Sequence, residues 1–92
     1  MAGILESIAS NAFVVTPSNT LLIKADPNNT TEEPFVYLKN NTNAALSLKV
    51  KTRGGAEITI KIGAYFIEPI AVQQVFVTGS DAISAGNLLA YF

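Results

Sequence analysis

The stretch from residue 45 to residue 62 reads ALSLKVKTRGGAEITIKI, and it decides the fold. In its first half apolar residues at positions 46, 48 and 50 alternate with polar ones, and in its second half isoleucines do so at positions 58, 60 and 62. Strict alternation is typical of a β-strand with one dry face and one wet face. We therefore expect two amphipathic strands, Ala45–Thr52 and Ala56–Ile62, joined as a hairpin.

The loop between these strands fixes which residues face each other. A two-residue loop would put Val50 opposite Thr59 and so mix the dry and wet faces of the hairpin. A three-residue loop over positions 53–55 puts Val50 opposite Ile58, and every directly opposed pair then shares a face. Gly55 can take the left-handed conformation that such a loop needs, so we expect the three-residue loop.

Outside the hairpin, short runs rich in Val, Ile, Thr and aromatic residues are separated by clusters of Asn, Gly, Pro and Ser. This pattern is typical of an all-β domain, with any helix confined to the chain ends. The further strands that we expect are Ala12–Thr16, Thr20–Ala25, Phe35–Asn40, Ala64–Ile67, Val75–Thr78 and Leu88–Phe92. The predicted fold is a small antiparallel β-sandwich or jelly-roll-like barrel over residues 12–92, preceded by a short N-terminal arm over residues 1–11.

The composition argues against several classes of function. Six Lys or Arg against seven Asp or Glu give a net charge of −1, whereas nucleic-acid binding demands a basic surface. Without Cys or His, the chain lacks disulfides, thiolate and imidazole metal ligands, and the commonest general base. No apolar run approaches the ~20 residues that cross a bilayer, and none resembles a signal-peptide core. We expect no enzyme activity, catalytic residue, cofactor, metal, nucleic acid or membrane partner, and synthesis in the cytoplasm.

Three groups of residues could still carry chemistry, and each also has a plainer interpretation. The pair Glu32-Glu33 could serve as general acid and base, and the oxygen-rich run that begins at Asp26 could hold Ca²⁺. Both lie in a Pro- and Asn-rich segment that we expect to be an exposed loop. A basic group on one face of the hairpin would suit an acidic partner or simply solvent, and it comprises Lys49, Lys51, Arg53 and Lys61. Three tyrosines could stack on sugars or pack in a core or interface, namely Tyr37, Tyr65 and Tyr91.

Low charge and apolar chain ends favour assembly with other subunits. Only 14% of the residues are charged while 49% are hydrophobic, and the mean hydropathy is +0.34, so much apolar surface has few charges to shield it. The last strand is apolar on both faces, which indicates burial inside a sandwich or against another subunit. The arm makes only one or two helical turns and should order on a partner. We expect a cyclic homo-oligomer, and the expected contact residues are Ile4, Leu5, Ile8, Phe66, Ile70, Leu89, Tyr91 and Phe92.

Short motifs spread over most of the chain carry a resemblance to a known family. The opening segment Ala12-Phe-Val-Val-Thr-Pro-Ser18 is followed by Phe35-Val-Tyr-Leu38 and then by Glu57-Ile-Thr-Ile60 with Gly63. Ile67-Glu-Pro-Ile70 leads through Val72 and Val75 to Val77-Thr-Gly-Ser-Asp-Ala82, and Leu88-Leu-Ala-Tyr-Phe92 closes the chain. In this order the motifs resemble those of small virion proteins of tailed phages and gene-transfer-agent particles, the head-spike base and capsid-decorating proteins. Gln74 stands where that family usually has a basic residue, and Ser80-Asp81 replaces its Thr-Thr pair.

The resemblance implies a phage virion structural protein, a capsid vertex (head-spike base) or decoration component on the capsid exterior, made in the host cytoplasm. It implies symmetric assembly without catalysis. The partners would be further copies of the chain, as a pentamer or trimer, the major capsid protein and, where the vertex carries one, a fibre protein. The alternative is a carbohydrate-binding or adhesin-like β-module of a phage fibre or cell-surface apparatus, which needs tyrosines that converge on one exposed face.

Overall fold

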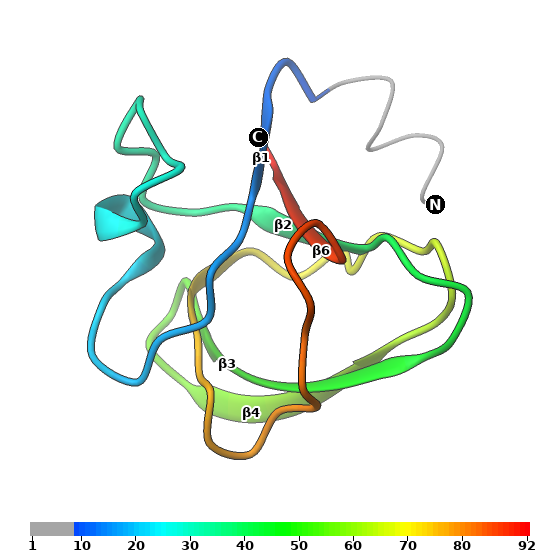
Figure 1. Cartoon of the computed structure of the whole chain (residues 1–92). Helices are drawn as coiled ribbons and strands as arrows, with labels where there is room; N and C mark the ends of the chain where they lie inside the picture. Colours follow the sequence, from blue (N-terminus) through cyan, green and yellow to red (C-terminus); the bar gives the residue numbers. More distant parts are fainter. Residues whose placement is uncertain (1–8) are drawn as a thin grey trace.

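Two three-stranded antiparallel sheets form the protein in a computed structural model that describes residues 9–92 (Figure 1). One sheet has the strand order β1-β6-β2 and the other the order β4-β3-β5. In chain order the elements are β1 (Ala12–Val14), the 3₁₀ helix η1 (Ile23–Ala25), β2 (Tyr37–Asn40), β3 (Leu46–Thr52), β4 (Glu57–Ile62), β5 (Val72–Val75) and β6 (Leu88–Tyr91). The predicted small all-β sandwich is confirmed.

The hairpin of β3 and β4 has the register that its alternation predicts. Val50 lies opposite Ile58, and the paired residues along both strands share their faces as expected. Gly55 has a φ of +91°, in the left-handed region that a side chain would disfavour, and its N–H donates to the carbonyl of Thr52 at 2.9 Å. The three-residue loop is therefore confirmed, and it fixes which residues of β4 face the core.

The core lies between the two sheets and consists of the inward residues of each strand. Leu46, Leu48 and Val50 of β3 are buried, while the polar residues between them are partly exposed on the outer face. Complete burial of one such aliphatic side chain stabilises the fold by about 1.5–3 kcal/mol. The aliphatic side chains with no exposed surface are Val36, Leu38, Leu48, Val50, Val72, Leu88 and Ala90.

The last strand, β6, is the central strand of its sheet, which explains its two apolar faces. It pairs with β1 on one side and with β2 on the other. Leu88 and Ala90 face the core and are fully buried, whereas Leu89 and Tyr91 face outwards and are half-buried. The inward face thus contributes to the core of the same chain, and only the outward face remains as a candidate contact surface.

The strand predicted at Thr20–Ala25 is wrong, because this segment forms a turn followed by η1. The hydroxyl oxygen of Ser18 accepts hydrogen bonds from the backbone N–H groups of Thr20 at 3.1 Å and Leu21 at 3.0 Å. Such side-chain bonds replace the ladder that a strand would need. Of the apolar residues here only Ile23 is buried, which leaves Leu21 exposed.

The strand predicted at Ala64–Ile67 is also wrong, because a turn occupies most of it. The N–H of Phe66 donates to the carbonyl of Gly63 at 3.0 Å, and only Ile67 makes an isolated bridge, to Lys39 of β2. An apolar run without alternation gave no signal of this turn.

The strand predicted at Val75–Thr78 is displaced towards the amino terminus, since β5 spans Val72–Val75. The amide side chain of Asn19 takes the place of a neighbouring strand beyond β5. Its oxygen accepts from the N–H groups of Val77 at 3.0 Å and Thr78 at 3.1 Å, and its nitrogen donates to the hydroxyl oxygen of Thr78 at 3.0 Å.

Most of the predicted N-terminal arm, including Ile4, Leu5 and Ile8, lies outside the described residues. Where the description begins, the N–H groups of Ser10 and Asn11 donate to the carbonyl of Phe92 at 2.8 and 2.9 Å. The carbonyl of Asn11 also accepts from the N–H of Phe92, so residues 10 and 11 continue the pairing of β1 with β6.

Candidate assembly surface

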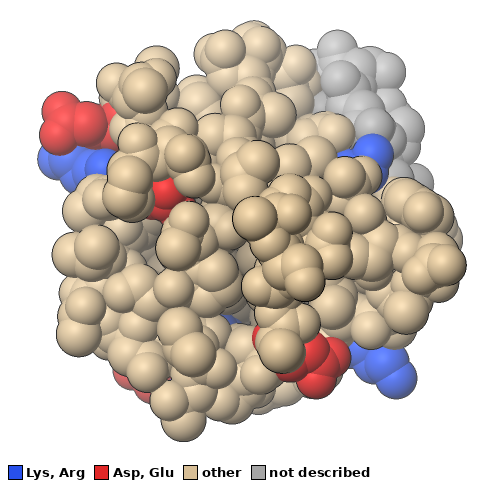
Figure 2. Space-filling view, in the orientation of Figure 1, with Lys and Arg blue, Asp and Glu red and all other residues tan. Residues whose placement is uncertain are grey.

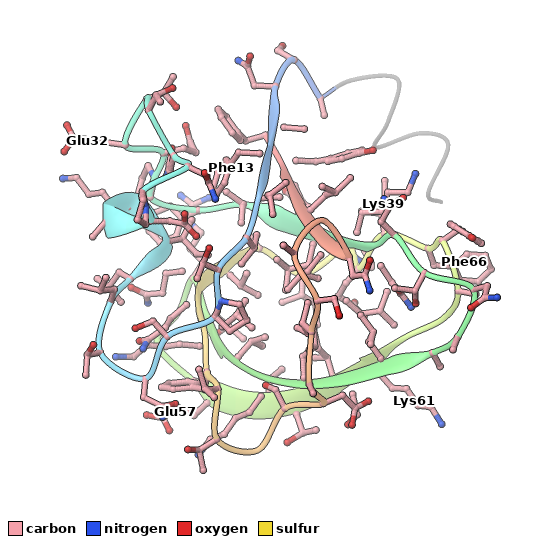
Figure 3. All side chains as sticks on the ribbon, viewed as in Figure 1. Phe13, Glu32, Lys39, Glu57, Lys61 and Phe66 are labelled. Atoms are coloured by element: carbon pink, nitrogen blue, oxygen red, sulfur yellow. The ribbon has the colours of Figure 1, made fainter. Side chains whose placement is uncertain are left out.

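A segment between β4 and β5, residues 63–71, presents large apolar side chains to solvent; we call it the 63–71 segment. The side chains of Tyr65, Phe66 and Ile70 are 54%, 64% and 39% exposed. Figure 3 shows Phe66 at the outer edge of the molecule. Exposed apolar side chains grouped in this way mark interaction surfaces on soluble proteins.

Backbone hydrogen bonds hold the 63–71 segment against β2, the edge strand of the first sheet, β1-β6-β2. The N–H of Asn40 donates to the carbonyl of Phe66 at 3.0 Å, and the N–H of Glu68 donates to the carbonyl of Leu38 at 2.8 Å. Between them Ile67 is buried. The segment therefore runs along the free edge of β2 and presents Phe66 from a fixed backbone, which lowers the entropy lost when a partner binds.

Tyr65 has a φ of +59°, and among the non-glycine residues of 9–92 only Glu32 shares a positive value. Bulky side chains rarely adopt this left-handed conformation, and residues that do so are found preferentially at binding sites and switch regions. At Gly63, an added Cβ would come within 3.2 Å of the ring of Phe66. The turn thus places the ring of Phe66 over Gly63 and holds the preceding residue, Tyr65, in a strained backbone conformation.

The structure separates the contact residues that the sequence predicts into three places. Phe66 and Ile70 are exposed on the 63–71 segment, beyond β2, and Leu89 and Tyr91 are half-buried on the outward face of β6. Phe92 packs against the core and contacts the ring of Phe13 edge-to-face at 5.8 Å between centroids. The side chains of β2 therefore lie between the first two groups.

Several exposed apolar side chains were not predicted as contact residues. Leu21, Leu22 and Val77 are all more than a third exposed; the two leucines lie in the segment 20–25, which forms no strand, and Val77 lies just after the end of β5. Val77 lines a surface groove together with Pro17 and Phe76. No sequence signal marked these residues, because a two-sided apolar run is typical of a buried strand.

Charged side chains are sparse on the face of the molecule drawn in Figure 2, and most of them lie near its edge. On the second sheet, the amine of Lys49 lies 3.6 Å from the carboxylate of Glu57 and 5.3 Å from the ring centroid of Phe76. Arg53, grouped with these lysines in the sequence, lies over the ring of Phe35 at 5.1 Å. Two members of the basic group, Lys49 and Arg53, therefore have local partners.

The polar loop after η1 uses its side chains to hold its own backbone. Contrary to the predicted exposure, Asp26 and Asn29 are buried. The carboxylate of Asp26 accepts from the N–H groups of Thr16 and Asn28, each at 2.8 Å. Glu32 is exposed and has a φ of +55°. Over residues 9–92 no three metal-ligating side chains gather into a site, and no helix there is long and apolar enough to span a membrane.

Two of the three tyrosines meet on the outward face of the first sheet. Tyr37 of β2 lies directly opposite Tyr91 of β6, whereas Tyr65 lies on the 63–71 segment. The amine of Lys39 sits 5.8 Å from the centroid of the Tyr91 ring, a cation–π distance. Tyr37 and Tyr91 together offer an aromatic surface, and Lys39 approaches the ring of Tyr91.

Comparison of the chain with protein-family models, with curated proteins and with solved structures finds no match. The resemblance to phage virion proteins therefore rests on the motifs of the sequence and stays a prediction.

Proposed function

We propose that the protein is a structural subunit of a phage virion, a capsid vertex (head-spike base) or decoration component that acts by symmetric assembly. The observation that carries the proposal is the 63–71 segment, where Tyr65, Phe66 and Ile70 are exposed on a fixed backbone. The low charge of the chain and the order of its motifs support the same assignment.

Assembly would use the exposed side chains as anchors. Burying one large apolar side chain contributes about 1.5–3 kcal/mol, and aromatic residues dominate the binding energy of protein interfaces. In a cyclic homo-oligomer, pentamer or trimer, each subunit repeats such a contact with its neighbour. The major capsid protein, and a fibre protein where the vertex carries one, would bind the surfaces that the ring leaves open.

The test is the presence of the chain in purified particles of the phage whose genome encodes it. Mass spectrometry and electron microscopy should find the 9.7 kDa chain in a fixed copy number on the capsid exterior. Purified Phe66→Ser should lose assembly that the wild type shows in light scattering, whereas Leu21→Ser, exposed elsewhere on the surface, should keep it. Particles that contain no copy of the chain would refute the proposal.

A second candidate function, carbohydrate binding, is favoured by the direct opposition of Tyr37 and Tyr91 on one sheet face. Sugars stack on such rings, but Lys39 already approaches the ring of Tyr91. Titration with N-acetylglucosamine and galactose oligomers, followed by the NMR signals of both rings, separates the two candidates. Shifts that disappear in Tyr37→Ala would favour the sugar-binding module.

A further inference from the structure

The outer edge of β4 carries backbone groups that have no partner among residues 9–92. In an antiparallel strand, alternate residues direct their N–H and C=O groups to opposite sides. On β3, the carbonyl of Lys49 accepts from Phe76 and the carbonyl of Ser47 accepts from Asp81, so these two residues point away from β4. The residues of β3 between and beside them, such as Leu48, therefore bond to β4.

The register of the hairpin shows which residues of β4 direct their backbone groups away from β3. Leu48 pairs with Ile60, so Ile60 directs its backbone groups to β3 and its neighbours Thr59 and Lys61 direct theirs outwards. By the same alternation Glu57 faces outwards, and no hydrogen bond within residues 9–92 reaches the outward groups of these three residues. The residues 57, 58, 59 and 61 are all exposed, so the edge is accessible.

Among the other sheet edges in the described chain, those of β5 and β2 have backbone partners and that of β1 is covered in part. Val36 exchanges backbone hydrogen bonds with Val72 at the edge of β5, and the 63–71 segment runs along β2. At the edge of β1, the side-chain amide of Asn28 donates to the carbonyl of Val14 at 3.0 Å. Open edges favour strand addition, and proteins usually block them. β4, with six residues, is longer than β1 or β2.

We propose that β4 pairs antiparallel with β4 of a second copy of this chain, about a twofold axis at Thr59. Glu57 then lies opposite Lys61 of the second copy, and Lys61 lies opposite Glu57 of the second copy. Each of the three outward residues meets an outward residue, which gives about six backbone hydrogen bonds, two for each pair. The two β4-β3-β5 sheets join into one continuous sheet.

The charges of the edge select this register. Figure 3 shows Glu57 and Lys61 towards the two ends of β4, on the lower side of the molecule. A twofold axis at either charged residue would place it opposite its own copy, and parallel pairing in register would oppose like charges twice, which destabilises a sheet. Only the axis at Thr59 pairs all three outward residues and matches both charges.

The opposite face of the paired strands supports the same arrangement. Ile58 is 37% exposed although it lies on the core side of the sheet, opposite Val50. In the proposed register Ile58 packs beside Ile60 of the second copy, because residues equally distant from Thr59 are opposed. The contact therefore buries an apolar side chain that the single chain leaves partly in water.

This contact is independent of the proposed function, because it uses the second sheet and not the 63–71 segment. An isologous twofold contact closes a dimer by itself, and it would join two rings face to face if a cyclic oligomer also forms. In either case, loss of the β4 contact halves the mass of the assembly, whereas loss of the ring contact through Phe66→Ser leaves a dimer.

The test uses two complementary charge reversals, of which Glu57→Lys also removes the ion pair with Lys49 in the same chain. Glu57→Lys places lysine opposite lysine at both ends of the contact, and Lys61→Glu places glutamate opposite glutamate. In sedimentation velocity at low salt, each variant alone should dissociate at a concentration roughly tenfold or more above that of the wild type. An equimolar mixture of the two variants should restore association, since every pair then has opposite charges.

The backbone of the contact is tested separately. Thr59→Pro removes an N–H group that points to the open edge of β4, and it should abolish the association of two copies through β4. An edge strand tolerates proline, but it cannot donate a hydrogen bond at that position. Thr59→Val keeps the N–H and should associate as the wild type does. A wild type that shows no β4-dependent association at several hundred micromolar, or single reversals that associate like the wild type, would overturn the proposal. Failure of the mixture to recover would also overturn it.

Discussion

The side chain of Asn40 is the most connected buried polar group of the fold, and its removal should destabilise the protein strongly. Asn40 ends β2 and has no exposed surface. Its nitrogen lies 2.7 Å from the carbonyl of Ala44, 3.0 Å from that of Ile62 and 3.2 Å from that of Gly63. Its oxygen accepts from the N–H of Thr42 at 3.0 Å and from the hydroxyl of the same residue at 2.6 Å. One amide thus ties both sheets to the turn after β2.

The magnitude follows from the number of bonds that the amide can make. The nitrogen carries two hydrogens, so it satisfies two of its three carbonyl neighbours fully, and the oxygen accepts two bonds. At about 1 kcal/mol net for each, Asn40→Ala should lower the free energy of unfolding by about 3–4 kcal/mol. For a domain of this size the melting temperature should fall by about 12–30 °C.

The assay is a thermal and urea melt followed by circular dichroism, with Asn41→Ala as the matched control. Asn41 is the next residue, it is exposed, and its side chain makes one bond, to the carbonyl of Gly86 at 3.2 Å. The control should change stability by less than about 1 kcal/mol. Asn40→Asp should be at least as harmful as Asn40→Ala, because it sets a carboxylate oxygen against carbonyl oxygens. The reasoning is refuted if Asn40→Ala and Asn41→Ala melt together.

Three further substitutions probe the hairpin and the end of β5. Val50→Asp should cost about 3–5 kcal/mol in a denaturant melt because it places an unpaired charge in the core, and a melt within a degree or two of the wild type would contradict this. Gly55→Ala should cost about 1 kcal/mol, since alanine is strained at a φ of +91°, whereas Gly54→Ala should change the melt little. Asn19→Ala should speed hydrogen exchange of the Val77 amide, and unchanged protection would show that Asn19 does not hold that strand end.

The hairpin could be predicted in full because all of its determinants are local. Alternation identifies the inward residues of both strands, and the requirement that opposed residues share a face leaves only the loop of positions 53–55. Gly55 supplies the one left-handed residue that this loop needs. The same strict pattern is absent elsewhere in the chain, which is why prediction weakened away from the hairpin.

The wrongly predicted strands depend on partners distant in the sequence or on single side chains. Asn19 binds the backbone of Val77 and Thr78, 58 and 59 residues away, and so replaces strand pairing at the end of β5. Ser18 bends the chain locally at Thr20 through a hydroxyl that the sequence could have flagged as a turn former. For the candidate surface, Phe66 and Ile70 were predicted as contact residues and are exposed, but the strained turn at Tyr65 had no sequence signal.

Core packing and edge chemistry in β4 are coupled through one register. The isoleucines at positions 58, 60 and 62 lie on the core side of the sheet, so the alternate residues Glu57, Thr59 and Lys61 have their side chains on the outer face, and two of these carry the opposite charges. A slip of one residue would bury Glu57 and Lys61 and would expose the isoleucines, at a cost far above that of any edge contact. The burial of the hairpin within a single chain therefore fixes the spacing of opposite charges about Thr59 before any second copy arrives. Because the core sets the register of β4, the charges at positions 57 and 61 can be reversed without disturbing the fold. The two reversals therefore distinguish a β4 edge that repels other strands from one that pairs selectively with its own copy.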